Sequence, residues 1–131
     1  MPKKDPMLQF APKSVSKSLL QELPDRSRKI LVDRFGLGGK SEERTLDAIG
    51  KEYGITRERV RQIENHGLTL IRQGENYETQ AQVWKTLKDA LTELGEVVVE
   101  SDALDALAKN DSDRNHLIFL LTVGNQFGYR R

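Results

Sequence analysis

Hydrophobic residues recur every three to four positions along most of the chain, which is the period of an amphipathic helix. Prolines and glycines divide the first half into four predicted helices, at about residues 14–23, 24–35, 45–53 and 56–72. Ser14, Thr45 and Thr56 stand where N-caps are expected, and Gly36 and Gly54 stand where helices are expected to end. The segment 38–41 between the second and third helices is predicted to be a loop.

The second half continues the pattern less regularly, after a turn expected at residues 74–76. Helices are predicted at 80–94, near 101–109 and near 111–123. Residues 96–99 (EVVV) favour a short strand because three β-branched residues follow one another. The tail 124–131 contains two glycines and two aromatic residues, and it is expected to be a hairpin or the first part of a longer element.

The segment 46–65, LDAIGKEYGITRERVRQIEN, combines the features of a helix-turn-helix. Gly54 can adopt the left-handed conformation that the turn needs, and Gly50 lets the second helix approach the first closely. Five apolar residues are expected to face inward and hold the two helices together: Ile49, Tyr53, Ile55, Val60 and Ile63. An ordinary helical hairpin is the alternative, although a hairpin does not require all of these features at this spacing.

With Val60 and Ile63 facing inward, one face at the start of the second helix presents Arg57, Glu58, Arg61 and Gln62. Arginine can donate two hydrogen bonds to guanine, glutamate can accept from cytosine, and glutamine can address adenine or a thymine edge. We therefore expect these four side chains to read bases in the major groove of DNA. The alternative is a solvated face on which Glu58 pairs with Arg61, three residues further along the helix.

Contacts to the DNA backbone are expected beside this face. The helix N-termini at Thr45 and Thr56 offer backbone N–H groups and a positive dipole end to phosphates. Lys51 and Arg59 are further candidates for phosphate contacts. The charge distribution agrees, because residues 1–73 hold 15 Lys and Arg against 10 Asp and Glu, a net charge of +5. Residues 74–131 hold 6 basic against 10 acidic residues, a net charge of −4.

No catalytic, metal or cofactor site is predicted. The chain has no cysteine, which excludes disulfides, thiolate metal sites and thiol nucleophiles. His66 and His116 lie far apart in sequence; His66 is expected to be solvated or to contact a phosphate, and His116 to be a hydrogen-bonded histidine at the edge of the core. The segment GGKS at 38–41 lacks the earlier glycine of a phosphate-binding loop. These observations argue against an enzyme, a cofactor and a small-molecule substrate.

No apolar run approaches the roughly 20 residues needed to cross a membrane. Residues 1–13 are basic and proline-rich without an apolar segment of the signal-peptide type, and they are predicted to be a flexible arm. No membrane partner is therefore expected. The predicted location is the cytoplasm, in association with the nucleoid.

Two adjoining stretches, LPDRSRKILVDRFGL at 23–37 and RTLDAIGKEYGITRERVRQIE at 44–64, resemble region four of bacterial housekeeping-type RNA polymerase sigma factors. The resemblance covers about residues 15–72. It implies binding to the upstream, minus thirty-five promoter element, with Arg57, Glu58 and Gln62 reading bases. Arg61 would contact a base or a phosphate, and Arg59 the backbone. It also implies docking on the flap-tip helix of the polymerase β subunit through the helices within 19–35.

The chain departs from this family beyond the recognition helix. No part of it resembles region two, and Asn65-His66-Gly67 breaks the usual pattern; Gly67 should weaken its helix by about 1 kcal/mol relative to alanine. The predicted fold is all-α: the arm at 1–13, a helix-turn-helix domain of sigma region-four type at 14–73, and a small acidic helical module at 80–131. This arrangement resembles proteins that join a sigma-like helix-turn-helix to a small helical domain.

The function predicted for this architecture is that of a sequence-specific DNA-binding transcription factor that also contacts RNA polymerase. The alternative is a protein-binding module on the sigma scaffold, directed at the polymerase flap or at a sigma partner, with little DNA affinity of its own. The acidic module has two alternatives. In a winged-helix form, residues 127–131 would place arginines near DNA; otherwise the module would serve dimerisation or docking.

Overall fold

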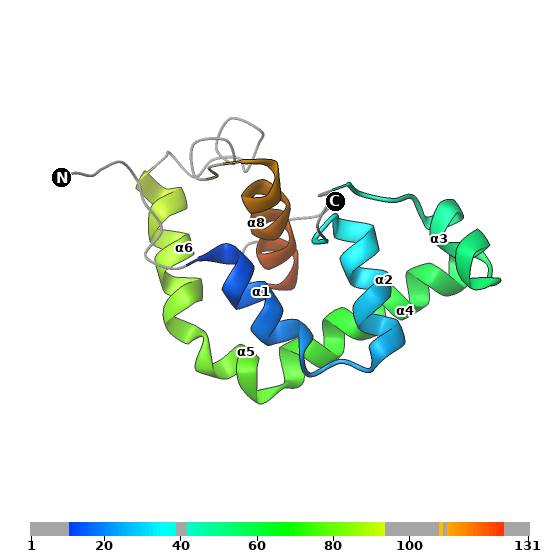
Figure 1. Ribbon diagram of the computed structural model, residues 1–131. Coiled ribbons are helices and arrows are strands. Elements are labelled where there is room, and N and C mark those ends of the chain that lie inside the picture. The colour runs from blue at the N-terminus through cyan, green and yellow to red at the C-terminus, as the bar shows by residue number, and fades with distance from the viewer. Residues whose placement is uncertain (1–10, 39–41, 94–107, 109, 125–131) are drawn as a thin grey trace.

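The computed structural model describes residues 11–38, 42–93, 108 and 110–124, and these residues form α-helices and no strand (Figure 1). The seven helices of this described part are α1 (Pro12–Leu20), α2 (Asp25–Phe35), α3 (Leu46–Tyr53), α4 (Arg57–Gln73), α5 (Glu75–Thr79), α6 (Ala81–Glu93) and α8 (Asp111–Val123). The all-helical prediction is confirmed for these residues. The strand expected at 96–99, the helix expected near 101–109, nearly all of the N-terminal arm and the tail from 125 lie outside them.

The helix boundaries follow the local signals in the sequence for most of the chain. α2, α3, α4, α6 and α8 begin and end within two residues of the predicted positions. Gly36 ends α2 and Gly54 ends α3, each with a φ of +70°, a left-handed conformation that glycine adopts without a steric penalty. These two glycines therefore set the lengths of the helices that precede them.

Two local predictions are wrong. Ser14 does not cap the first helix, because α1 begins two residues earlier, with Ala11 as N-cap and Pro12 in the first turn, where the fixed φ of proline favours initiation. The turn expected at 74–76 is reduced to Gly74, since the helix α5 starts at Glu75. Asn76 anchors α5 to α1, because its Nδ2 donates to the Ser18 carbonyl oxygen at 2.8 Å.

The apolar side chains form two clusters. The smaller cluster lies among α2, α3 and α4 and contains Ile30, Ile49, Val60 and Ile63. The larger one extends from α1 through the later parts of α2 and α4 to α6 and α8. α2 and α4 contribute to both clusters, so they connect the α3 end of the molecule to the end that carries α6 and α8 (Figure 1).

α4 continues through Gly67 without interruption. A Cβ atom at this position would lie 3.1 Å from Cδ1 of Leu31 on α2, closer than an ordinary van der Waals contact. The glycine that weakens the helix in isolation therefore lets α2 and α4 pack closely.

His116 differs from its prediction. The side chain lies against the core as expected, but it is only 3% exposed and neither ring nitrogen has a hydrogen-bond partner. The prediction of a hydrogen-bonded histidine at the core edge is therefore not confirmed by the hydrogen-bond geometry, although the Leu37 backbone lies close enough to raise its pKa.

Candidate DNA-binding site

The turn between α3 and α4 is built around two glycines. Gly54 ends α3 with φ +70° and ψ 35°, and the Ile55 amide then donates to the Gly50 carbonyl oxygen at 2.9 Å. A Cβ atom on Gly50 would lie 2.6 Å from the Ile55 carbonyl oxygen, a distance that side chains do not tolerate. Gly50 therefore allows the turn to fold back onto α3, which fixes the angle at which α4 leaves it.

The side chains expected to face inward lie at the junction of the two helices. Ile49 and Val60 are fully buried and Ile63 is 9% exposed, while Tyr53 and Ile55 are half-buried at the margin of the same cluster. Ile30 from α2 completes the cluster. Because Val60 and Ile63 are fixed inward, the other side of the first turns of α4 faces solvent.

Both helices begin at a threonine N-cap, as predicted. The Thr45 hydroxyl accepts a hydrogen bond from the Ala48 amide and the Thr56 hydroxyl one from the Arg59 amide, each at 3.0 Å. The other amides of each first turn remain directed along the helix axis, where they can meet an anion. Lys51 is exposed on α3.

The start of α4 presents five exposed polar side chains: Arg57, Glu58, Arg59, Arg61 and Gln62. They pair with one another and with α3. Arg61 binds the Glu58 carboxylate through Nη2 at 2.6 Å and Nε at 3.3 Å, which is the i, i+3 pair that the alternative interpretation expects. Arg59 Nη1 donates to Gln62 Oε1 at 3.2 Å, and Arg57 Nη1 lies 3.8 Å from the Asp47 carboxylate.

These pairs leave the side chains at the start of α4 charged and free to exchange their partners. The hydrogen bond from Arg61 lowers the pKa of Glu58, and the charges of Arg61 and Arg57 add to the effect, so this carboxylate is an acceptor at neutral pH. All of the pairs are open to water, where exposed ion pairs are weak and are screened by salt. Each partner can therefore exchange its neighbour for a base edge or a phosphate.

A second group of charges, which the sequence did not predict, holds α3 in place behind this face. Arg34 on α2 forms a half-buried ion pair with Glu64 of α4 at 3.0 Å and also donates to the Arg44 carbonyl oxygen at 3.3 Å. Arg44 in turn binds Asp33 of α2 at 3.3 Å and Glu52 of α3. The partners are 8 to 30 residues apart, a separation at which no helical periodicity reports a contact.

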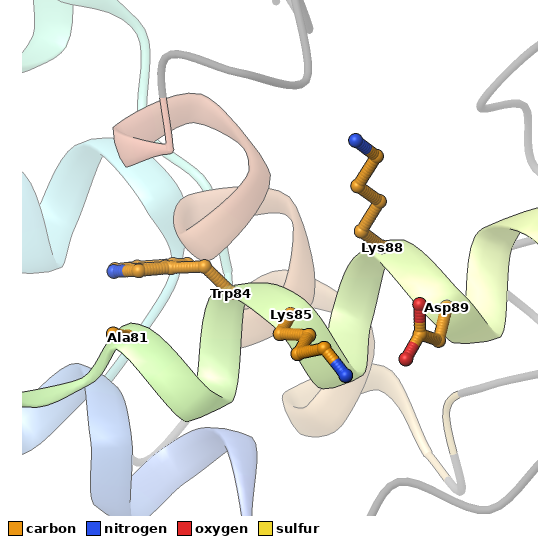
Figure 2. Close-up of a pocket in the computed structure, with 5 residues that line it drawn as sticks. All are labelled: Ala81, Trp84, Lys85, Lys88 and Asp89. Carbon is orange, nitrogen blue, oxygen red and sulfur yellow. The ribbon is translucent and has the colours of Figure 1, made fainter.

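A second surface feature lies on α6. An open hollow on α6 is lined by Ala81, Trp84, Lys85, Lys88 and Asp89, and these side chains point in different directions rather than toward one centre (Figure 2). Among the described residues, no group of three or more acidic or histidine side chains is placed to hold a metal ion. No helix of this part of the chain is long and apolar enough to span a membrane.

Comparison with known proteins bears directly on the two-glycine turn and the helix after it. The family described as "Sigma-70, region 4" matches residues 19–73, which contain α2, α3 and α4. Residues 19–73 are a sigma-70 region 4 domain. Its fold is of the helix-turn-helix type.

Two sigma factors show how far the similarity extends. The RNA polymerase sigma factor RpoD of Helicobacter pylori is 43% identical over 60 residues, which are 46% of this chain and 9% of that protein. The RNA polymerase principal sigma factor HrdD of Streptomyces griseus is 44% identical over 54 residues, 41% of this chain and 16% of that protein. The chain thus spans a small part of these relatives, and α6 and α8 lie beyond the region 4 domain.

Proposed function

We propose that the region 4 domain of this protein binds double-stranded promoter DNA in a sequence-specific manner, at an element of the minus thirty-five type. The observation that carries the proposal is the exposed polar face at the start of α4, held outward by buried Val60 and Ile63. A helix that enters the major groove by its N-terminal end needs such a face together with a rigid support. The family match and the positive charge of residues 1–73 support the same proposal.

The side chains divide into two roles. Arg57, Glu58, Arg61 and Gln62 are the proposed base readers, because they share the exposed face and have the donors and acceptors that base edges require. Arg59 and Lys51, with the helix starts at Thr45 and Thr56, are proposed to contact phosphates. Binding requires Arg61 to exchange Glu58, and Arg57 to exchange Asp47, for groups on the DNA.

Selection of bound sequences from a random DNA pool would define the best site, and variants would then test the roles. Arg57→Ala should relax preference at one G·C position, since a bidentate arginine–guanine contact discriminates by about 1–3 kcal/mol. Arg59→Ala should instead weaken binding to all sequences alike and lower the slope of log K against log salt by about one. Lys85→Ala, on the exposed surface of α6, is the control.

A triple variant, Arg57→Ala with Glu58→Ala and Gln62→Ala, gives the decisive comparison. These side chains are exposed, so the variant should fold normally and lose its preferred site. If it binds that site with the affinity of the unaltered chain, the proposed reading face is wrong.

The proposal includes a contact with RNA polymerase through α1 and α2, on the flap of the β subunit. The support for this contact is the family match, since the apolar residues Leu19, Leu20, Leu23, Leu31 and Phe35 are packed in the larger cluster of the chain itself. If the chain acts mainly as a protein-binding module, immobilised core polymerase should retain it while the DNA affinity stays low and nearly independent of salt. A steep negative salt dependence favours direct DNA contact instead.

A further inference from the structure

The apolar side of α1 and α2 is covered by a helix of the same chain. α8 lies beyond the region 4 domain in sequence, yet it packs directly against α1, α2 and α4 (Figure 1). Its residues 115–121 are all buried. Phe119 contacts Phe35 of α2 edge to face, with 5.2 Å between the ring centroids. The surface that the proposed function assigns to an external helix is thus filled by an internal one.

Specific polar contacts hold α8 in this position. The buried Asn115 side chain donates to the Gly36 carbonyl oxygen at 3.1 Å, where α2 ends. Arg72 of α4 donates to the Thr122 and Val123 carbonyl oxygens, each at 2.8 Å, and so caps the last turn of α8. These contacts fix the register of α8 on the region 4 domain.

The interface also contains polar atoms that are not satisfied. In the described part of the chain, the buried side-chain atoms without a hydrogen-bond partner are Oγ of Ser16 on α1 and both ring nitrogens of His116 on α8. Burying such groups without partners disfavours the packed state. The release of α8 would return the His116 ring to water. Burial of this ring therefore disfavours the packing of α8 against α1 and α2.

We propose that α8 is an intramolecular ligand of a helix-docking face on α1 and α2, and that this face accepts an apolar helix of a partner protein when α8 leaves it. Exchange of one apolar helix for another leaves the buried apolar area nearly unchanged. The polar groups therefore decide whether α8 or a partner helix occupies the face. Asn115 and Arg72 favour α8, while unpartnered His116 disfavours it. The identity of the partner as RNA polymerase rests on the proposed function. The displacement of α8 is proposed independently of it.

The chemistry of the partner helix follows from that of α8. Its central residues, Leu117 to Leu121, are leucine, isoleucine and phenylalanine, and its first turn carries Asp111 and Asp113. The face therefore fits an amphipathic helix with a Leu/Ile/Phe stripe and an acidic first turn.

A labelled peptide and variants of the full chain test the exchange. The probe is a fluorescent synthetic peptide of residues 110–124 in which leucine replaces His116. Asn115→Ala in the chain loosens only its own α8, because the peptide keeps its asparagine; it should bind the peptide about tenfold more tightly than the unaltered chain. His116→Leu in the chain should bind it about tenfold more weakly. Asp89→Asn, on the exposed surface of α6, makes the same kind of charge change away from α8; it is the control and should match the unaltered chain.

Hydrogen exchange shows whether the variants act where they should. Amides 113–124 should exchange faster in Asn115→Ala and more slowly in His116→Leu, while amides of α3 and α4 keep their rates. Because His116→Leu is expected to stabilise the chain, the test does not depend on a variant that fails to fold. Equal peptide affinity in all four chains would overturn the proposal.

Immobilised core RNA polymerase separates this proposal from the proposed function. If the polymerase retains Asn115→Ala more strongly than the unaltered chain, and His116→Leu more weakly, both the polymerase contact and the displacement of α8 are supported. If the peptide follows this order and no chain binds polymerase, α8 is displaceable and the proposed polymerase contact is wrong. If polymerase binds all chains equally and the peptide binds none, the polymerase contact uses another surface and the role proposed for α8 is overturned.

Discussion

At the scale of single residues, glycines show how different physical causes select the same amino acid. Gly54 is required by its backbone, because its φ is +70° and no atom lies within 4 Å of the Cβ position. Gly50 is required by space, because a Cβ there would meet the Ile55 carbonyl oxygen. The sequence predicts both roles, since both belong to one local motif, whereas the contact of Gly67 with Leu31 joins helices 36 positions apart and has no local signal.

These causes predict different stabilities for two alanine variants. Gly50→Ala should destabilise the protein by about 1–3 kcal/mol, because a backbone atom of the turn must move. Gly54→Ala should cost about 1–2 kcal/mol, the strain of a left-handed alanine, and Gly54→Asn should cost less. Urea unfolding measures all three. Equal stability of Gly50→Ala and the unaltered chain would contradict the close approach.

At the scale of the helices, the start of α4 depends on one hydroxyl group. Thr56→Ala removes the bond to the Arg59 amide and should reduce the free energy of unfolding by about 1 kcal/mol. Thr56→Ser keeps the hydroxyl and should restore most of it. Thermal unfolding followed by circular dichroism provides the measurement. A serine variant as unstable as the alanine variant would show that the methyl group, not the cap, matters.

The sequence predicts helices better than their assembly. Apolar periodicity, caps and glycines act within a few residues, and they place α2, α3, α4, α6 and α8 correctly. They also predict which residues of α4 are inward, because Val60 and Ile63 belong to the same helix. The Arg34–Glu64 pair and the bonds from Arg72 to α8 depend on tertiary packing, and so does the burial of His116. The residues that read DNA stay a prediction, since neither fold nor burial identifies a bound base.

At the scale of the whole molecule, the first and last described helices, α1 and α8, join in the larger apolar cluster. α8 contributes to the same apolar cluster as α1, although the two helices lie about a hundred residues apart in a chain whose halves have opposite charge. Loss of the α8 contact should therefore expose apolar surface on α1 and α2, while the small cluster behind the exposed polar face of α4 remains intact. A change at α8 should therefore alter the proposed helix-docking face on α1 and α2 without altering the proposed DNA contact at the start of α4.

The dependence of stability on pH tests this arrangement. Burial lowers the pKa of His116 below 6.5, Lys13 lowers it further, and Asp113 and the Leu37 backbone act in the opposite direction. The unfolded chain therefore takes up a proton at a higher pH than the folded chain. The resulting stability is present above pH 6.5 and is lost as the pH falls through the lower folded pKa.

The midpoint of thermal unfolding should therefore decrease from about pH 7 to about pH 5, and His116→Leu should flatten this part of the profile. Glu58 provides the control, because its pKa lies below 4.5 through its bond from Arg61, so Glu58→Gln should change the profile only at lower pH. In hydrogen exchange, acidification should raise the rates of α8, corrected for the intrinsic effect of pH, before those of α3 and α4. Simultaneous opening of all helices would show that His116 acts on the global fold and not on the α8 contact.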